Sequence, residues 1–234
     1  MKPRNPYTPE NRAETNYYKL GGYAFFRMKQ YLNSMKDLLQ TQKYRLQENY
    51  KEEIKKYPQY SQMIDGVYEE RYRELDVHFN RIMLNSSFIA SFSIFEIMFK
   101  EVCHLAAYKY SRSAELDFSS GIIDHYRSYI VKDLRIDISD LKQYWKKLIQ
   151  YRELRNHLIH HGSNIQKNPD NIIGFIRKLD SIKVKKIRNK DQYKFVLTDK
   201  QFIIEFLDTA SEFLANILLK LPKGKRKSLP HIKK

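Results

Sequence analysis

Residues 88–107 read FIASFSIFEIMFKEVCHLAA, and the spacing of their apolar side chains sets the fold class of the chain. The main apolar row recurs at steps of three and four residues, as one face of an α-helix does, and consists of Phe88, Phe92, Phe95, Phe99, Val102 and Ala106. A second row at steps of seven holds Ile89, Glu96 and Cys103. The stretch predicts a core helix of a mainly α-helical protein, in which Glu96 needs a partner.

The excess of positive charge indicates a polyanionic partner. With a formal net charge of +16, the basic side chains repel one another unless an anion neutralises them. These basic residues are interleaved with 18 Tyr and 13 Phe, whose rings can stack on bases. We therefore expect a nucleic-acid partner, with an anionic membrane surface as the open alternative. A chain of 234 residues, 42% of them hydrophobic, is long and apolar enough to bury a core.

Cysteine content and hydropathy bear on the compartment. Cys103 is the single cysteine, so it cannot form an internal disulfide and is expected to be a small core residue. No apolar segment follows Met1, and no apolar run approaches the roughly 18 to 20 residues that span a bilayer. The sequence predicts a soluble, cytoplasmic protein without a membrane partner.

Helices dominate the first half of the chain. Prolines among polar residues predict an irregular lead-in over residues 1–15. The region 16–60 is expected to form a long N-terminal helix, either continuous or broken at Gly21-Gly22. Pro58 interrupts this helix, because a proline disfavours helix in the residue before it. A second helix is expected over 62–110, then a polar connection over 111–120 and a short helix over 122–132.

Strands are expected only near the C-terminus. After an Asn/Pro-containing loop at 168–171, β-branched and aromatic runs at 182–184 and 193–197 flank a polar turn at 188–191 and predict a small β-hairpin before the last helix. Thr198 or Asp199 is expected to cap that helix, which runs to Leu219. Residues 61–222 then form one helical domain, followed by a basic flexible tail at 223–234 that is either solvated or an arm for RNA.

One helix carries the candidate chemistry. It is expected from Leu141 to His161, with Ser139 or Asp140 as its N-cap and Gly162 just past its end. Its apolar stripe consists of Leu141, Tyr144, Leu148, Tyr151 and Leu158.

The stripe has a gap of seven residues between Tyr151 and Leu158, and Arg155 lies at the position where its spacing predicts an apolar residue. A charge inside a buried stripe is expensive to desolvate, so Arg155 needs a carboxylate, a phosphate or a second subunit to face. Glu96 poses the same problem with the opposite sign, and pairing the two is the simplest hypothesis.

Arg155, Asn156 and His160 form a candidate catalytic site. Asn156 and His160 share a helix face, whereas Arg155 and His160 lie about 140° apart around the axis, so only a long side chain brings that pair together. A histidine exchanges protons near neutral pH, and an arginine fork suits a phosphate. Together they can cut RNA without metal, because the histidine helps the ribose 2′-hydroxyl attack the adjacent phosphate while the arginine stabilises the developing charge.

The run Arg155-Asn156-x-x-x-His160, after a helix carrying Phe92-Ser93-Ile94-Phe95-Glu96, resembles the signature of HEPN domains. That signature is an arginine, an adjacent polar residue and a histidine four to six residues on. The resemblance covers residues 86–221 and implies a HEPN-like helical bundle that dimerises through its motifs. It implies a metal-independent endoribonuclease of toxin, abortive-infection or other antiviral defence systems, with no cofactor and with RNA and an antitoxin or defence partner protein as partners.

The resemblance also assigns roles. Arg155, Asn156 and His160 take the catalytic positions, and His161 competes with His160 as acid or base because the family tolerates variable spacing. The supporting residues are His161 and Glu96, and the role of Glu96 rests on its expected pairing with Arg155. Toxins neutralised by a nucleotidyltransferase carry a tyrosine closely after the histidine, whereas residues 162–164 here read GSN. That type of control is not expected.

Rival interpretations concern the same residues. His157, His160 and His161 could ligate a metal, but no carboxylate or thiolate cluster accompanies them in sequence, and no metal site is expected. Three further acidic residues are more simply turn and cap residues than a divalent-metal site: Asp133, Asp137 and Asp140. The alternative function is a non-catalytic helical module that binds RNA or a protein, with the long N-terminal helix as its interaction arm.

Overall fold

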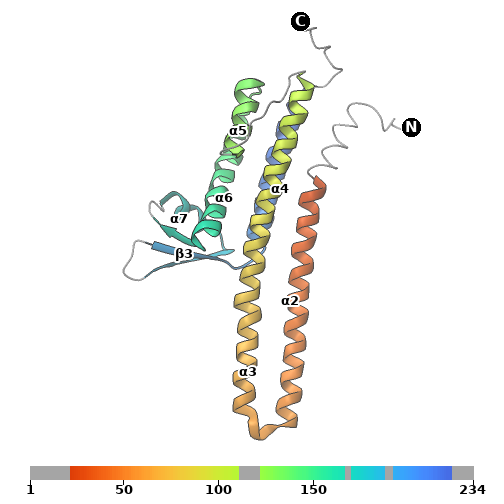
Figure 1. Cartoon of the computed structure of the whole chain (residues 1–234), viewed down its shortest axis with the longest axis vertical. Helices are drawn as coiled ribbons and strands as arrows, with labels where there is room; N and C mark the ends of the chain where they lie inside the picture. The colour runs from red at the N-terminus through yellow and green to blue at the C-terminus, as the bar shows by residue number, and fades with distance from the viewer. Residues whose placement is uncertain (1–21, 111–121, 167–169, 188–191, 223–234) are drawn as a thin grey trace, which may run out of the picture. The chain divides into compact units, whose positions relative to one another are not determined.

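The computed structural model describes residues 22–110, 122–166, 170–187 and 192–222, and it is mostly helical with one small sheet (Figure 1). The helices are α2 (Tyr23–Lys56), α3 (Ser61–Arg73), α4 (Asn80–Lys109), α5 (Ile122–Ser128), α6 (Lys142–His161), α7 (Asp170–Ile176) and α8 (Gln201–Leu219). The strands are β1 (Asn164–Gln166), β2 (Ile182–Lys186) and β3 (Gln192–Leu197).

The chain divides into two compact units. Among the described residues, the first unit comprises 22–26, 91–110, 122–152 and 205–222, and the second comprises 27–90, 153–166, 170–187 and 192–204. The expected single domain over 61–222 stays a prediction.

Aromatic packing between α4, α5 and α8 builds the core of the first unit. The ring of Phe99 lies 5.5 Å from that of Phe213 on α8, 5.4 Å from that of Tyr126 and 5.8 Å from that of Phe95, centroid to centroid. All six members of the predicted apolar row of α4 are buried, which confirms this core helix. Cys103 is buried too, as expected, and burial raises the pKa of its thiol.

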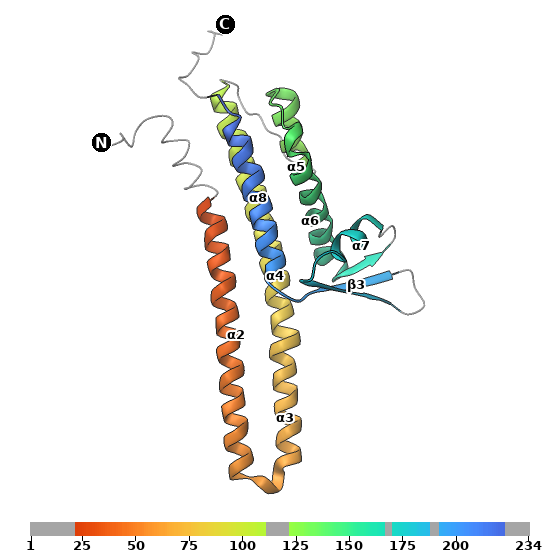
Figure 2. The ribbon, with the colours of Figure 1, turned by 180° about the vertical axis from the view of Figure 1, so that it is seen from behind.

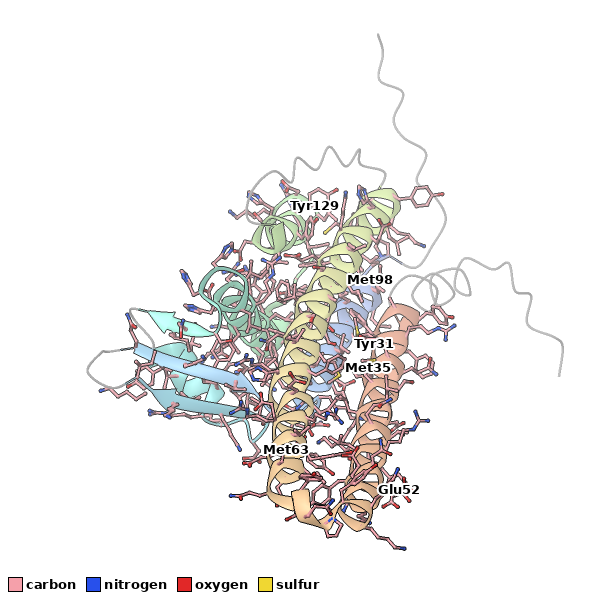
Figure 3. The ribbon with its side chains drawn as sticks, turned by 60° about the horizontal axis from the view of Figure 1, so that its bottom comes forward. Tyr31, Met35, Glu52, Met63, Met98 and Tyr129 are labelled. Atoms are coloured by element: carbon pink, nitrogen blue, oxygen red, sulfur yellow. The ribbon has the colours of Figure 1, made fainter. Side chains whose placement is uncertain are left out.

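An antiparallel helical hairpin forms the long part of the second unit. The helices α2 and α3 lie side by side in both views (Figures 1 and 2), and Glu52 and Met63 mark the approach to the turn between them (Figure 3). The hydroxyl of Tyr50 donates a hydrogen bond of 2.7 Å to Asp65 across the hairpin, and Tyr50 and Tyr68 pack edge to face at 5.3 Å. Pro58 opens a short 3-10 turn between the helices, so the expected break is confirmed.

A three-stranded antiparallel sheet with the order β1-β3-β2 completes the second unit. The predicted hairpin is present as β2 and β3, while β1 and α7 were not expected from the sequence. Ile182 pairs with Leu197, and Ile165 pairs with Tyr193, so the buried residues of the three strands share one face. Helix α7 buries Ile172, Ile173 and Ile176 and lies against the sheet (Figures 1 and 2).

Three details of the expected helices need correction. The expected short helix over 122–132 passes into a π-helical turn at Tyr129–Asp133. The expected helix over 62–110 is interrupted by a π-helical turn at Glu74–Phe79. The prediction that Ser139 or Asp140 caps the motif helix is wrong. Ile138 is the N-cap of the leading 3-10 turn, and the carboxylate of Asp137 accepts the backbone N–H of Ser139 at 2.9 Å, which lowers the pKa of Asp137. Asp140 instead pairs with Lys220 at 2.9 Å.

Asp199, one of the two expected N-cap residues of α8, caps the start of this helix. Asp199 accepts a hydrogen bond of 2.8 Å from the backbone N–H of Gln201, satisfying a first-turn amide that has no partner within the helix. Helix α8 ends at Leu219, as predicted. Four expected features fall wholly outside the described residues: the lead-in at 1–15, the connection at 111–120, the hairpin turn at 188–191 and the tail at 223–234. The expected loop at 168–171 is described only from Asp170, where α7 begins.

One helical stretch passes a simple test for a membrane span, contrary to the expectation from the sequence. Pro58–Lys109 is long and apolar enough by length and composition, and 44% of its most apolar window is buried inside the protein. Core helices of soluble proteins pass the same test. The Phe rings of α4 already pack on α8, for example Phe92 on Phe206 at 5.4 Å, so a protein core accounts for much of this hydropathy.

Candidate active site

The predicted site residues of the motif lie on the last two turns of α6, within the second unit. Leu154 and Leu158 are buried there, whereas Arg155 and Asn156 are half-buried and His160 and His161 are exposed. Leu154 is therefore the buried residue of the apolar stripe at the point where the sequence pattern places Arg155. The expectation that Arg155 fills the apolar stripe is wrong: Arg155 flanks it.

Arg155 is held by its neighbour in the sequence. Its Nη1 donates a hydrogen bond of 3.0 Å to Oδ1 of Asn156, and its Nε is buried away from solvent. The side-chain amide of Asn156 thus orients the guanidinium, and fixing one edge of the fork reduces the entropy lost when the other edge binds an anion. The sequence marked Asn156 as a motif position without revealing this contact.

Three imidazoles gather at the end of α6. The rings of His157 and His161 lie 5.5 Å apart, and those of His160 and His161 lie 6.4 Å apart, centroid to centroid. Exposure leaves His160 and His161 accessible to a ligand. No group of three or more His, Cys, Asp or Glu side chains within the described ranges is arranged to hold a metal ion.

Two left-handed residues fix the end of the helix. Gly162 has φ +56° and Ser163 has φ 75°, conformations that only glycine adopts without cost. Ser163 compensates with two backbone hydrogen bonds, donating to the carbonyl of His157 at 3.4 Å and accepting from the amide of Phe195 at 3.1 Å. The histidine cluster is therefore anchored directly to β3.

Burial gives His157 a different electrostatic environment from an exposed histidine. Burial lowers its pKa, the nearby His161 lowers it further, and a hydrogen bond with the backbone of Asn164 acts in the opposite direction. His157 is consequently suited to packing as a neutral ring against the helix end.

Acidification should weaken the fold through His157. Because its folded pKa is depressed, His157 contributes stability above the ordinary value of 6.5 and loses it as the pH falls from 6.5 through the folded value. We expect the thermal midpoint of His157→Gln to depend less on pH than that of the wild type across about pH 8 to about pH 5. The exposed His125→Gln is the matched control and should keep the wild-type dependence; equal slopes for all three proteins would contradict this role.

Glu96, the predicted supporting carboxylate, is half-buried on α4 in the first unit. Its pairing with Arg155 stays a prediction, because the two residues belong to different units.

Comparison with protein-family models, with curated proteins and with solved structures finds no match for this chain.

Proposed function

We propose that this chain is a metal-independent endoribonuclease of the HEPN type that works as a homodimer in cytoplasmic toxin or anti-phage defence. The observation that carries the proposal is the end of α6, whose last two turns hold both an asparagine-oriented Arg155 and the exposed His160 and His161. A cation that binds phosphate and two accessible acid–base groups are the parts that metal-free RNA cleavage needs. The net charge of +16 favours the same polyanionic substrate.

In the proposed reaction the 2′-oxygen of a ribose attacks the adjacent phosphorus. His160 accepts the proton of the 2′-hydroxyl, and the bond from phosphorus to the 5′-oxygen breaks. The leaving 5′-oxygen takes a proton from a second imidazole, and the candidate is the exposed His161, 6.4 Å from His160 between ring centroids. Arg155 stabilises the charge on the non-bridging oxygens. The products are a 2′,3′-cyclic phosphate and a 5′-hydroxyl.

Cleavage should survive removal of metal ions. We expect the purified full chain to cut RNA in excess EDTA, because a guanidinium and imidazoles supply the charge stabilisation and proton transfer. The measurement is gel analysis of labelled RNA with mapping of the ends, which should carry cyclic phosphate or 3′-phosphate. DNA of the same sequence, which lacks the 2′-hydroxyl, is the control and should remain intact. Loss of all cleavage with EDTA would exclude the mechanism.

The second candidate function is a non-catalytic module that binds RNA or a partner protein. The observation in its favour is a set of large apolar side chains that the helical hairpin leaves exposed, including Tyr31, Leu38, Tyr44, Met63 and Val67. Such side chains are typical of interaction surfaces when they gather in a patch. A binding-only protein would retain RNA at low salt, release it steeply as salt rises and never yield fragments.

A further inference from the structure

The exposed face of the small sheet carries a cluster of lysines that the proposed active site does not use. We infer that this face, which we call the lysine face and define by Lys183, Lys185 and Lys194, binds the phosphate backbone of the single-stranded RNA substrate beside the cleavage site. The inference rests on the proposed function, since it names the surface that holds the substrate.

Strand register places the three side chains on one face. Lys185 pairs directly with Lys194, and Lys183 lies two residues from Lys185 on β2, so it projects to the same side. The opposite face holds the buried residues Ile182, Phe195 and Leu197. All three lysines are exposed, which agrees with this alternation; nitrogen-tipped side chains stand along the strands in Figure 3.

The arrangement is unfavourable for the folded protein alone. Directly opposed residues on antiparallel strands have Cβ atoms roughly 4.5–5.5 Å apart, and like charges at that separation destabilise the sheet. No residue of the three strands is acidic, and none of the three lysines forms an ion pair with a described residue. A cluster of this kind gains stability when a polyanion neutralises it.

The chain passes directly from the candidate site into the sheet that carries the lysine face. Asn164, three residues after His161, pairs with Lys194 in the sheet, and the backbone of Ser163 bonds to Phe195. Lys185, Lys194 and Asn164 thus form one row across the three strands, with neighbouring strands about 4.8 Å apart. A strand of RNA whose phosphate reaches Arg155 and His160 can continue over this row. All of these residues belong to the second unit.

RNA is favoured over an anionic membrane by the make-up of this face. Membrane-binding surfaces combine basic residues with apolar side chains that enter the acyl region. Among the strand residues whose side chains are described, the other positions on the lysine face are Asn164, Gln192 and Val196, with no large apolar side chain. The pattern fits the electrostatic track of a single-strand binding surface.

The test is the salt dependence of binding to a short 2′-O-methyl RNA, which cannot be cut by 2′-oxygen attack. We expect the triple variant Lys183→Gln, Lys185→Gln, Lys194→Gln to lower the magnitude of the slope of log affinity against log salt by about 2, at roughly 0.7 per phosphate contact. Between about 50 and about 200 mM salt the wild type should then lose about 16-fold more affinity than the variant. The matched control removes the same charge from the exposed Lys132, Lys142 and Lys147 of the first unit and should keep the wild-type slope.

Each outcome decides between the two proposals. A wild-type slope in the sheet triple, or an equal decrease in the control triple, overturns the inference, whether or not ordinary RNA is cut. A reduced slope together with intact ordinary RNA supports the lysine face and rejects the nuclease. Binding to phosphatidylglycerol vesicles that the sheet triple loses while it keeps RNA affinity would assign the face to membranes and overturn the inference.

Discussion

Replacing Arg155 by alanine is expected to reduce RNA cleavage by about 10²–10³-fold, the usual loss when one group that stabilises a developing oxyanion is removed. The guanidinium is oriented by Asn156 through a 3.0 Å hydrogen bond, so Asn156→Ala should give a smaller loss in the same direction. Arg155→Lys should not restore the activity, because an ammonium cannot use one edge for the amide and the other for the phosphate. Single-turnover cleavage rates at saturating protein measure these effects.

Single substitutions of His160 and His161 distinguish their roles in catalysis. His160→Ala and His161→Ala should each lower the rate by about 10²–10⁴-fold if one acts as base and the other as acid. If only one acts, only its variant should lose activity, and the competition between His160 and His161 is resolved directly.

Two exposed residues provide matched controls for these variants. Arg45→Ala on α2 and His125→Ala on α5 remove the same side-chain types away from the motif and should leave the rate unchanged. Circular dichroism establishes that each variant is folded. Full activity of the Arg155→Ala, His160→Ala double variant would exclude the proposed site.

Replacing Phe99 by alanine is expected to destabilise the protein by about 3–5 kcal/mol, the usual cost of a large cavity in a core. Phe99 is fully buried, and its ring contacts those of Phe95, Tyr126, Trp145 and Phe213 at centroid distances of 5.4 to 6.5 Å. Because the surrounding rings are rigid, the site cannot collapse around the smaller side chain. Urea unfolding followed by circular dichroism measures the loss as a lower midpoint.

The matched control for this prediction is Phe26→Ala. Phe26 lies on α2 with 54% of its surface exposed, so its removal creates no cavity and should change stability by no more than about 0.5 kcal/mol. Equal midpoints for the Phe99 and Phe26 variants would contradict the assignment of Phe99 to the core.

Local sequence patterns predicted the helices well, because the three- and four-residue spacing of apolar side chains in a helix can be recognised from residues close together in the sequence. The row from Phe88 to Ala106 is buried as expected, and both the break at Pro58 and the end of α8 follow from residues at those points. The missed elements β1 and α7 are short, and β1 exists as a strand only through its pairing with β3, about thirty residues later. A three-residue strand has no period long enough to detect in isolation.

The candidate site was located by the sequence, but its environment was not. The spacing of Arg155, Asn156 and His160 on one helix end follows from helix geometry alone. The assignment of the buried step failed because Leu154 and Arg155 are adjacent, and a stripe with steps of three and four can pass through either position.

The sequence by itself thus determined the core helix, the hairpin strands and the position of the candidate residues at one helix end, since each depends on contacts between near neighbours. Only the tertiary structure decided that Leu154 is buried in place of Arg155 and that Lys185 lies opposite Lys194. The physical reason is that burial and strand register depend on which distant segment packs against a residue. In a sheet, a shift of one residue moves every side chain to the other face.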